Sequence, residues 1–239
     1  MIGLGTIINV GAIIGGGILG GLFGRKMTQR FQNTLMHGVA VCVIFLGIGS
    51  CLAEMLVATG DGFTTQGTMM MIGCFAIGAI IGEACKIEQR IEHFGEWLKI
   101  KTKSQHDTVF VDAFVTASVT VCIGAMAVVG ALTDGLTGDY SILLAKAILD
   151  FIIIMIMTAS MGKGCAFSAI PVGIFQGVIT LLARFVEPLM TEQALSNLSL
   201  TGSMLIFCVG VNLLFGKKVS VANLLPAIFL AVGWAFLPI

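Results

Sequence analysis

The chain has 239 residues, of which 57% are hydrophobic and 11% charged, and its formal net charge is zero. Soluble domains carry about a quarter charged residues, so this chain has too few charges to cover a surface that faces water. The neutral balance also gives no reason to expect a nucleic-acid partner. The composition therefore predicts an integral membrane protein, with the lipid bilayer as its main partner.

Apolar runs near 20 residues recur along the chain, which is the length needed to cross roughly 30 Å of hydrocarbon. They do not alternate polar and apolar residues, so they predict helices. We expect an all-α, polytopic transmembrane helix bundle of about eight spans, forming one domain over residues 1–239. The expected spans are roughly 2–24, 34–58, 66–84, 108–131, 141–161, 164–186, 199–215 and 219–237.

The first span is dense in glycine, and several of its glycines are four residues apart. Small residues at this spacing let two helix backbones approach closely in lipid. The pattern predicts tight packing within the bundle or a homo-oligomer contact between copies; a gating surface is the alternative. The glycines are Gly11, Gly15, Gly16, Gly17, Gly20, Gly21 and Gly24.

Two polar segments between spans predict interfacial helices. The segment 86–103 has charges opposite an apolar face, which is typical of an amphipathic helix lying at the membrane surface, with Trp97 near the headgroups. The second residue of the segment 187–198 is Pro188, and proline is suited to the first turn of a helix. The apolar face of 86–103 consists of Ile87, Ile91, Phe94 and Leu98.

Loop charges alternate in sign along the chain. Basic residues follow the odd-numbered spans, and acidic residues fill the other loops, apart from the exceptions Lys146 and Arg184. By the positive-inside rule, this pattern places the odd loops in the cytoplasm and both termini outside. The basic residues are Arg25, Lys26, Arg30, Lys86, Arg90, Lys99, Lys101, Lys103, Lys163, Lys217 and Lys218, and the acidic residues are Asp61, Asp134, Asp139, Glu187 and Glu192.

Asp112 lies inside the apolar stretch TVFVDAFVTASVTVC (108–122), on one helix face with Thr108, Thr116 and Thr120. A charged group at the centre of a span costs about 2.5–3.5 kcal/mol on insertion scales. We therefore expect this face to line the bundle interior or a water-filled cavity.

Lys146 and Asp150 are four residues apart in the fifth expected span, so they share a helix face and can form an ion pair. One interpretation is a static salt bridge that holds this helix in the bundle. The other is a coordination site for a cation or a proton, with Asp150 as the exchanging group. The sequence leaves both open.

Further polar residues at depth could join these charges. Pro171 interrupts its helix near Ser168 and frees backbone carbonyls there. For a single Asn or Gln, an interhelical hydrogen bond is the alternative to a substrate contact. The candidate substrate or ion site consists of Asn9, Asp112, Thr116, Lys146, Asp150, Ser168 and Gln176.

Catalytic and metal-binding motifs are missing from the sequence. The seven cysteines form no CxxC pair and have no metal-ligand spacing with a histidine, so packing is the expected role for them. Neither GxSxG nor HExxH occurs. We expect no metal, no cofactor and no enzymatic activity.

Three blocks carry a family resemblance: MIGLGTIINVGAIIGGGILGGLFGRKM, DAFVTASVTVCIGAMAVVGAL…GDYSILLAKAILD and SMGKGCAFSAIPVGIFQG. The chain resembles the YdfK/YqgA-like family of bacterial inner-membrane proteins, a domain of unknown function. The resemblance implies a multi-span helical fold in the bacterial plasma membrane and supplies no substrate. The matching blocks contain Asn9, Asp112, Asp139, Lys146, Asp150 and Gln176.

Together these features favour a small transporter or permease of unknown substrate, coupled to Na⁺ or protons. Asp112 and Asp150 would bind the cation or carry the proton, and Lys146 would hold an anionic group or act as a counter-charge. The partner would be a small solute or cation. The alternative is a membrane assembly or regulatory subunit that docks a partner through the glycine-rich span and the segment 86–103.

Overall fold

The computed structural model describes residues 2–24, 28–60, 62–102, 109–122 and 125–237. Five residues discussed above, Arg25, Lys26, Asp61, Lys103 and Thr108, lie outside these ranges.

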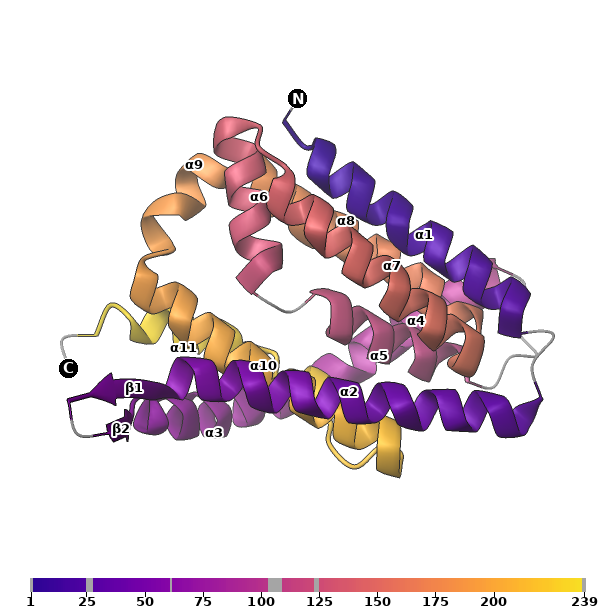
Figure 1. Ribbon diagram of the computed structural model, residues 1–239, viewed down its shortest axis with the longest axis horizontal. Coiled ribbons are helices and arrows are strands. Elements are labelled where there is room, and N and C mark those ends of the chain that lie inside the picture. Colours follow the sequence, from indigo (N-terminus) through magenta and orange to yellow (C-terminus); the bar gives the residue numbers. More distant parts are fainter. Residues whose placement is uncertain (1, 25–27, 61, 103–108, 123–124, 238–239) are drawn as a thin grey trace.

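The described chain is almost entirely helical (Figure 1). In chain order, with η for a 3₁₀ helix, the elements are α1 (Leu4–Gly24), α2 (Gln29–Met55), β1 (Leu56–Thr59), β2 (Gly62–Thr65), α3 (Thr68–Ala84), α4 (Ile87–Lys101), α5 (Phe110–Cys122), α6 (Ala125–Thr137), α7 (Ser141–Met161), η1 (Lys163–Ser168), α8 (Ala169–Leu181), α9 (Ala183–Val186), η2 (Glu187–Leu189), α10 (Glu192–Phe215), η3 (Val221–Leu224) and α11 (Pro226–Trp234).

Helix length and composition match a membrane bundle. Within the described residues, 5 helices are long and apolar enough to cross a membrane: α1, α2, α7, α10 and the continuous η1–α8 unit. Two bent pairs pass the same test, α3 with α4 at 54° and α5 with α6 at 61°, and a shorter apolar segment covers η3 and α11. These segments correspond to the expected spans, so the prediction of a polytopic helix bundle with about eight spans is confirmed.

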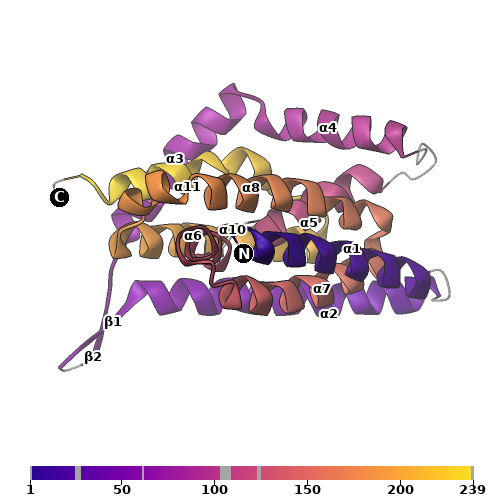
Figure 2. The same cartoon turned by 90° about the horizontal axis from the view of Figure 1, so that it is seen from above.

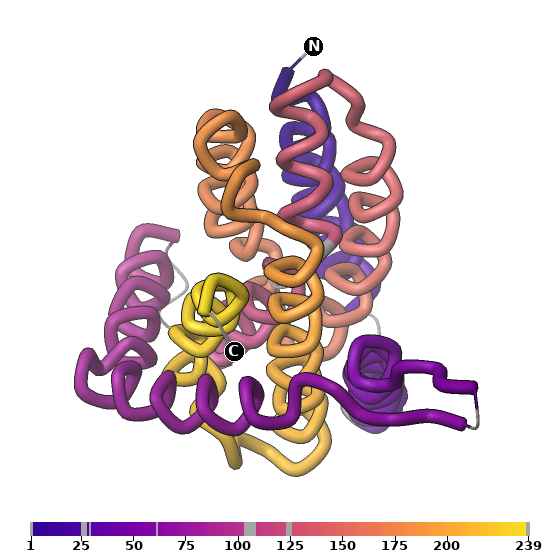
Figure 3. Tube along the Cα trace, turned by 90° about the vertical axis from the view of Figure 1, so that its left-hand side faces the viewer, coloured from indigo at the N-terminus to yellow at the C-terminus, as the bar shows by residue number. Residues whose placement is uncertain are grey.

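The helices pack in the directions that alternating crossings require. Gly16 contacts Phe151 and Gly24 contacts Ala159, so α1 and α7 run parallel, side by side (Figure 3). Gly78 contacts Ala227 near the start of α11, whereas Gly73, earlier in α3, faces its end, so α3 and α11 run antiparallel. If the chain crosses the membrane in alternating directions, two odd-numbered spans run in the same direction, as spans 1 and 5 do here. An odd-numbered and an even-numbered span run in opposite directions, as spans 3 and 8 do.

A short hairpin replaces the expected end of the second span. The helix predicted to reach residue 58 ends at Met55, and β1 then pairs antiparallel with β2, with Leu56 opposite Thr65. The two strands contain Val57 and three threonines, whose branched side chains favour strands. Gly62, with φ +151°, lies at the turn, where a residue without a side chain is tolerated.

Two other boundaries differ from the prediction. The fourth span is not one straight helix, because α5 and α6 are bent by 61°. The segment 187–198 is not a separate interfacial helix: α10 begins at Glu192, because Thr191 caps it by accepting a hydrogen bond from Ala194 N (3.2 Å). Asp134, expected in a loop, lies within α6 and is fully buried.

Helix α4 is amphipathic, as predicted, but its apolar face packs on protein. Leu98 is buried against Phe110 and Phe114 of α5. Trp97 stays half exposed and stacks on Phe94, with 5.7 Å between ring centroids. Figure 2 shows α4 along one edge of the molecule, with α2 along the opposite edge.

The glycines of α1 bring its backbone against α7. A Cβ at Gly20 would collide with the Met155 carbonyl oxygen and would lie 2.9 Å from Thr158 Cβ. Gly11, in contrast, has nothing within 4 Å of a Cβ. Most of the glycine stripe is therefore used for close packing inside the chain, and the homo-oligomer contact stays a prediction.

This packing predicts different effects on stability for two Gly→Ala substitutions. Gly20→Ala forces α1 away from α7 and should destabilise the protein by about 1–3 kcal/mol, as overpacking does. Gly11→Ala should leave stability unchanged. The thermal unfolding midpoints of the detergent-purified variants test this, and an unfolding midpoint for Gly20→Ala equal to that of Gly11→Ala would contradict it.

Candidate functional site

The central feature of the site is an ion pair in the middle of α7. Asp150 lies nine residues after Ser141 and eleven before Met161 in this 21-residue helix. Lys146 pairs with Asp150, and the two residues are 6% and 4% exposed. The pairing predicted from their spacing is confirmed. Two charges are thus buried at the middle of an apolar helix that is long enough to cross a membrane.

The C-terminal end of α5 meets this pair. The Lys146 ammonium also donates to the Val121 carbonyl oxygen at 2.8 Å, next to the last residue of α5. The last carbonyls of a helix have no intrahelical donor and carry partial negative charge. A broken helix that ends inside the bundle therefore presents acceptors, and Lys146 satisfies one of them.

Asn9 and Gln176 complete the buried cluster, which we define as Asn9, Val121, Lys146, Asp150 and Gln176. Asn9 Nδ2 donates to Gln176 Oε1 (3.2 Å), and Asn9 interacts with Asp150. Both amides are fully buried. Among the described residues, Asn9 Oδ1 and Gln176 Nε2 have no hydrogen-bond partner. Buried polar atoms are usually paired, so these two are available for a ligand.

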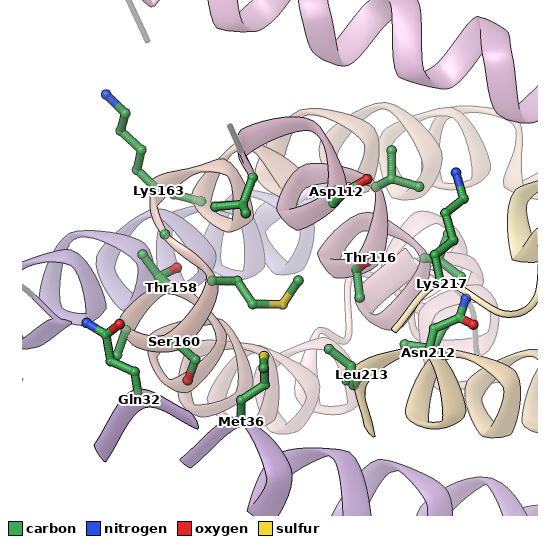
Figure 4. A pocket seen from close by; sticks show the side chains of 18 of the residues that line it. Gln32, Met36, Asp112, Thr116, Thr158, Ser160, Lys163, Asn212, Leu213 and Lys217 are labelled. Carbon is green, nitrogen blue, oxygen red and sulfur yellow. The ribbon is translucent and has the colours of Figure 1, made fainter. Parts of the chain in front are cut away.

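Asp112 and Thr116 lie elsewhere, in a cleft of about 1130 Å³ (Figure 4). Asp112 is exposed there and Thr116 half-buried, so these two residues of the polar face line a cavity, as predicted, whereas the Thr120 hydroxyl donates to the Thr116 carbonyl oxygen of its own helix. The cleft is also lined by Thr158, Lys163, Asn212 and Lys217. Thr158 follows Asp150 on α7 by two helical turns, or about 12 Å of rise.

The seven candidate residues are therefore divided. The structure brings together Asn9, Lys146, Asp150 and Gln176, but Asp112 and Thr116 line the separate cleft. Ser168 is fully buried in η1, and its hydroxyl has no partner within the described part of the chain. Asp112 and Asp150 do not line one cavity, because Asp112 opens into the cleft whereas Asp150 is buried beside Lys146 and is not part of the cleft lining.

The sequence did not predict an ion-pair bridge that Lys217 forms with Glu88 and Glu92 at the rim of the cleft. Lys217 Nζ lies 2.5 Å from Glu88 Oε1 and 2.6 Å from Glu92 Oε1. Partial burial lowers the pKa of Lys217, but the hydrogen bonds and charges of Glu88 and Glu92 outweigh this and raise it above its usual value. The spacing of the two glutamates put them on one face of α4. Their partner lies more than a hundred residues away, so no local pattern could identify it.

Asn223 ties the same region together. Its Oδ1 accepts from Glu88 N (2.8 Å), and its Nδ2 donates to Glu83 Oε2 (2.6 Å). Asn223 therefore links η3 to the junction of α3 and α4. This confirms the alternative interpretation, a hydrogen bond between elements, for this residue.

Residues 4–236 match the model of a family described as "Protein of unknown function (DUF554)". The chain belongs to this family. "Uncharacterized protein YqgA" of Escherichia coli (strain K12) is 30% identical over 236 residues, which cover 96% of this chain and 94% of the relative. "Uncharacterized membrane protein YdfK" of Bacillus subtilis (strain 168) is 28% identical over 226 residues, covering 95% and 93%. No solved structure matches. The family resemblance inferred from the sequence is confirmed.

In this DUF554 member, the cleft rim predicts a difference between adjacent lysines. Lys217→Met leaves the nearly buried Glu88 carboxylate without its cation. We expect a loss of about 1 kcal/mol, because Lys217 is 54% exposed and solvent screens the pair. Lys218→Met should have no effect, since this side chain joins no ion pair among the described residues. Thermal unfolding of both variants checks this, and equal midpoints would argue against the bridge.

Proposed function

We propose that the protein is a small-solute transporter or permease, coupled to an ion through its intramembrane carboxylates. The observation that carries this proposal is the buried Lys146–Asp150 pair at the end of α5. Replacing a buried ion pair with apolar residues is often neutral or stabilising, so a helix bundle does not need such a pair to fold. Ionisable groups at this depth typically mark substrate or ion pathways.

The broken fourth span supports the same proposal. Transporters often place their sites near the bilayer midplane, at helices that end there and expose backbone groups. Here α5 ends next to the ion pair, and α6 continues at a different angle (Figure 1). The end of α5 would supply a backbone carbonyl to a bound ion.

Access to the cluster differs at the two ends of the bundle. The cleft begins two turns from Asp150 on the side where α1 and α7 end. At the opposite end, Asp134 of α6 accepts hydrogen bonds from Gly3 N (3.2 Å) and Gly5 N (3.0 Å) at the start of α1. These hydrogen bonds hold the start of α1 against α6 at that end. A cleft at one end and packed helix termini at the other would suit a transporter open to a single side.

The cleft suits a small solute with both polar and apolar parts. Its lining combines the charges of Asp112, Lys163 and Lys217 and the hydroxyl of Thr116 with a larger apolar surface. Both signs of charge are present, so a molecule with charged or hydrogen-bonding groups on an apolar body fits this lining. Asp112 and Thr116 would meet the solute at the entrance, and the buried cluster would couple its passage to an ion.

Uptake into proteoliposomes tests the proposal. The full-length protein would be supplied with a defined mixture of amino acids, carboxylates, sugars and inorganic ions, and mass spectrometry would identify what accumulates. We expect at least one component to exceed its level in empty liposomes. Asp150→Asn should abolish that excess, because it removes the exchanging charge. Asp139→Asn, the matched change at an exposed loop carboxylate, should retain it.

Two results would count against transport. If liposomes with the wild-type protein accumulate none of the components, the transport proposal is contradicted. Accumulation that is equal in the wild type and in Asp150→Asn would assign the ion pair to scaffolding, and the assembly or regulatory role would then be favoured.

We further propose that the cleft faces the cytoplasm of a bacterial cell and that both termini lie outside. The basic loop residues support this orientation, since Lys163 and Lys217 line the cleft and Lys101 lies at the end of α4. In a variant whose exposed Cys42 and Cys85 are replaced by Ser, an impermeant maleimide should label Asp139→Cys in intact cells. Lys101→Cys should react only after permeabilisation. The reverse pattern would invert the topology.

A further inference from the structure

We propose that the buried cluster is a sodium site, in which the Lys146 ammonium occupies the position that Na⁺ takes when it binds. This inference rests on the proposed function, since it names the ion that would be coupled to solute movement. It concerns binding alone, however, so it can be tested without a known solute.

The oxygen atoms around the Lys146 ammonium are those that a sodium ion requires. The ammonium contacts the Asp150 carboxylate and the Val121 carbonyl oxygen. Hard cations select carboxylate and carbonyl oxygens. In membrane transporters, carbonyls at unwound helix segments and helix C-terminal ends coordinate Na⁺. The end of α5 supplies such a carbonyl within the bundle.

Asn9 provides the second, independent observation. Its Oδ1 is a buried acceptor, in a residue with 0% exposure, and no described residue donates to it. The same side chain interacts with Asp150. An unpaired acceptor in a dry interior is unfavourable, so its presence points to a ligand that it serves in another state. Because a carboxylate accepts, Asn9 faces Asp150 through Nδ2, and rotation of the amide would turn Oδ1 toward a cation bound at Asp150.

The composition of the cluster favours Na⁺ over a proton or a divalent ion. A proton needs only one oxygen of Asp150, so it would leave the Asn9 Oδ1 acceptor without a partner. A divalent metal usually takes several acidic ligands, and the described residues contain no group of three or more His, Cys, Asp or Glu that could hold one. One carboxylate with neutral oxygens balances one positive charge.

Lys146 and Na⁺ would therefore exclude each other. Each carries a single positive charge, and the described cluster has one carboxylate, Asp150, to neutralise it. Binding of Na⁺ requires the ammonium to leave the Asp150 and Val121 oxygens. This competition predicts that removal of the Lys146 charge strengthens sodium binding.

The experiment measures thermal unfolding of the detergent-purified, full-length protein while NaCl replaces choline chloride at constant ionic strength. A ligand that binds only the native state raises the midpoint in a saturable way. We expect such a rise for the wild type with Na⁺. Lys146→Met should lower the half-saturating concentration about tenfold or more. Asp150→Asn should lose the response, and the control Asp139→Asn should keep the wild-type response.

Asn9→Ala provides a variant that leaves the ion pair in place. It removes one proposed oxygen and should raise the half-saturating concentration about tenfold. Binding of ²²Na⁺ to the purified protein gives a second readout for any variant with a low midpoint, and unlabelled Na⁺ should displace it whereas choline should not.

Three results would overturn the sodium site. They are a sodium response that persists in Asp150→Asn, no gain in affinity in Lys146→Met, and a wild-type midpoint that depends on pH but not on Na⁺. None of these bears on solute uptake, which could still be driven by protons or run without coupling. Conversely, sodium binding without any uptake would leave the site intact and remove the transporter.

Discussion

One constraint shapes the surroundings of α7: two opposite charges are buried at its midpoint, away from water. The Lys146–Asp150 pair reduces the cost of burial, and the remaining donors and acceptors must come from neighbouring helices. The end of α5 supplies the Val121 carbonyl, and α1 supplies Asn9. The break between α5 and α6 is thus linked to the ion pair, because a continuous helix would keep its carbonyls for its own hydrogen bonds.

Close packing of α1 on α7 holds the cluster together. The contacts of Gly16 with Phe151 and of Gly20 with Met155 fix the register of two parallel helices. In that register, Asn9 lies beside Asp150. Larger residues at the glycine positions would separate the helices and move Asn9 out of reach. The glycine stripe and the polar cluster, which look unrelated in the sequence, are therefore parts of one arrangement.

The cleft is open to solvent, and the buried cluster lies deeper in the bundle. Asp112 lies at the open level, and Asp150 lies deeper, behind the two turns of α7 that end at Thr158. The Lys217 bridge holds α4 against this entrance through Glu88 and Glu92. A carboxylate in solvent and a carboxylate in a dry core have different tasks, since only the buried one must always be neutralised by a partner. This difference distinguishes Asp112 in the cleft from Asp150 in the buried cluster.

The sequence by itself determined the class of the fold, because apolar length and charge scarcity depend only on composition and local order. It also determined the Lys146–Asp150 pair, since helix geometry brings residues four apart together. Only the tertiary structure decided that Asp112 lies apart from Asp150 and that α5 stops at the ion pair. It alone decided that Lys217 joins Glu88. Some of these contacts join segments that are far apart in the sequence. Others use backbone carbonyls, whose direction depends on helix packing and cannot be inferred from which residues are present.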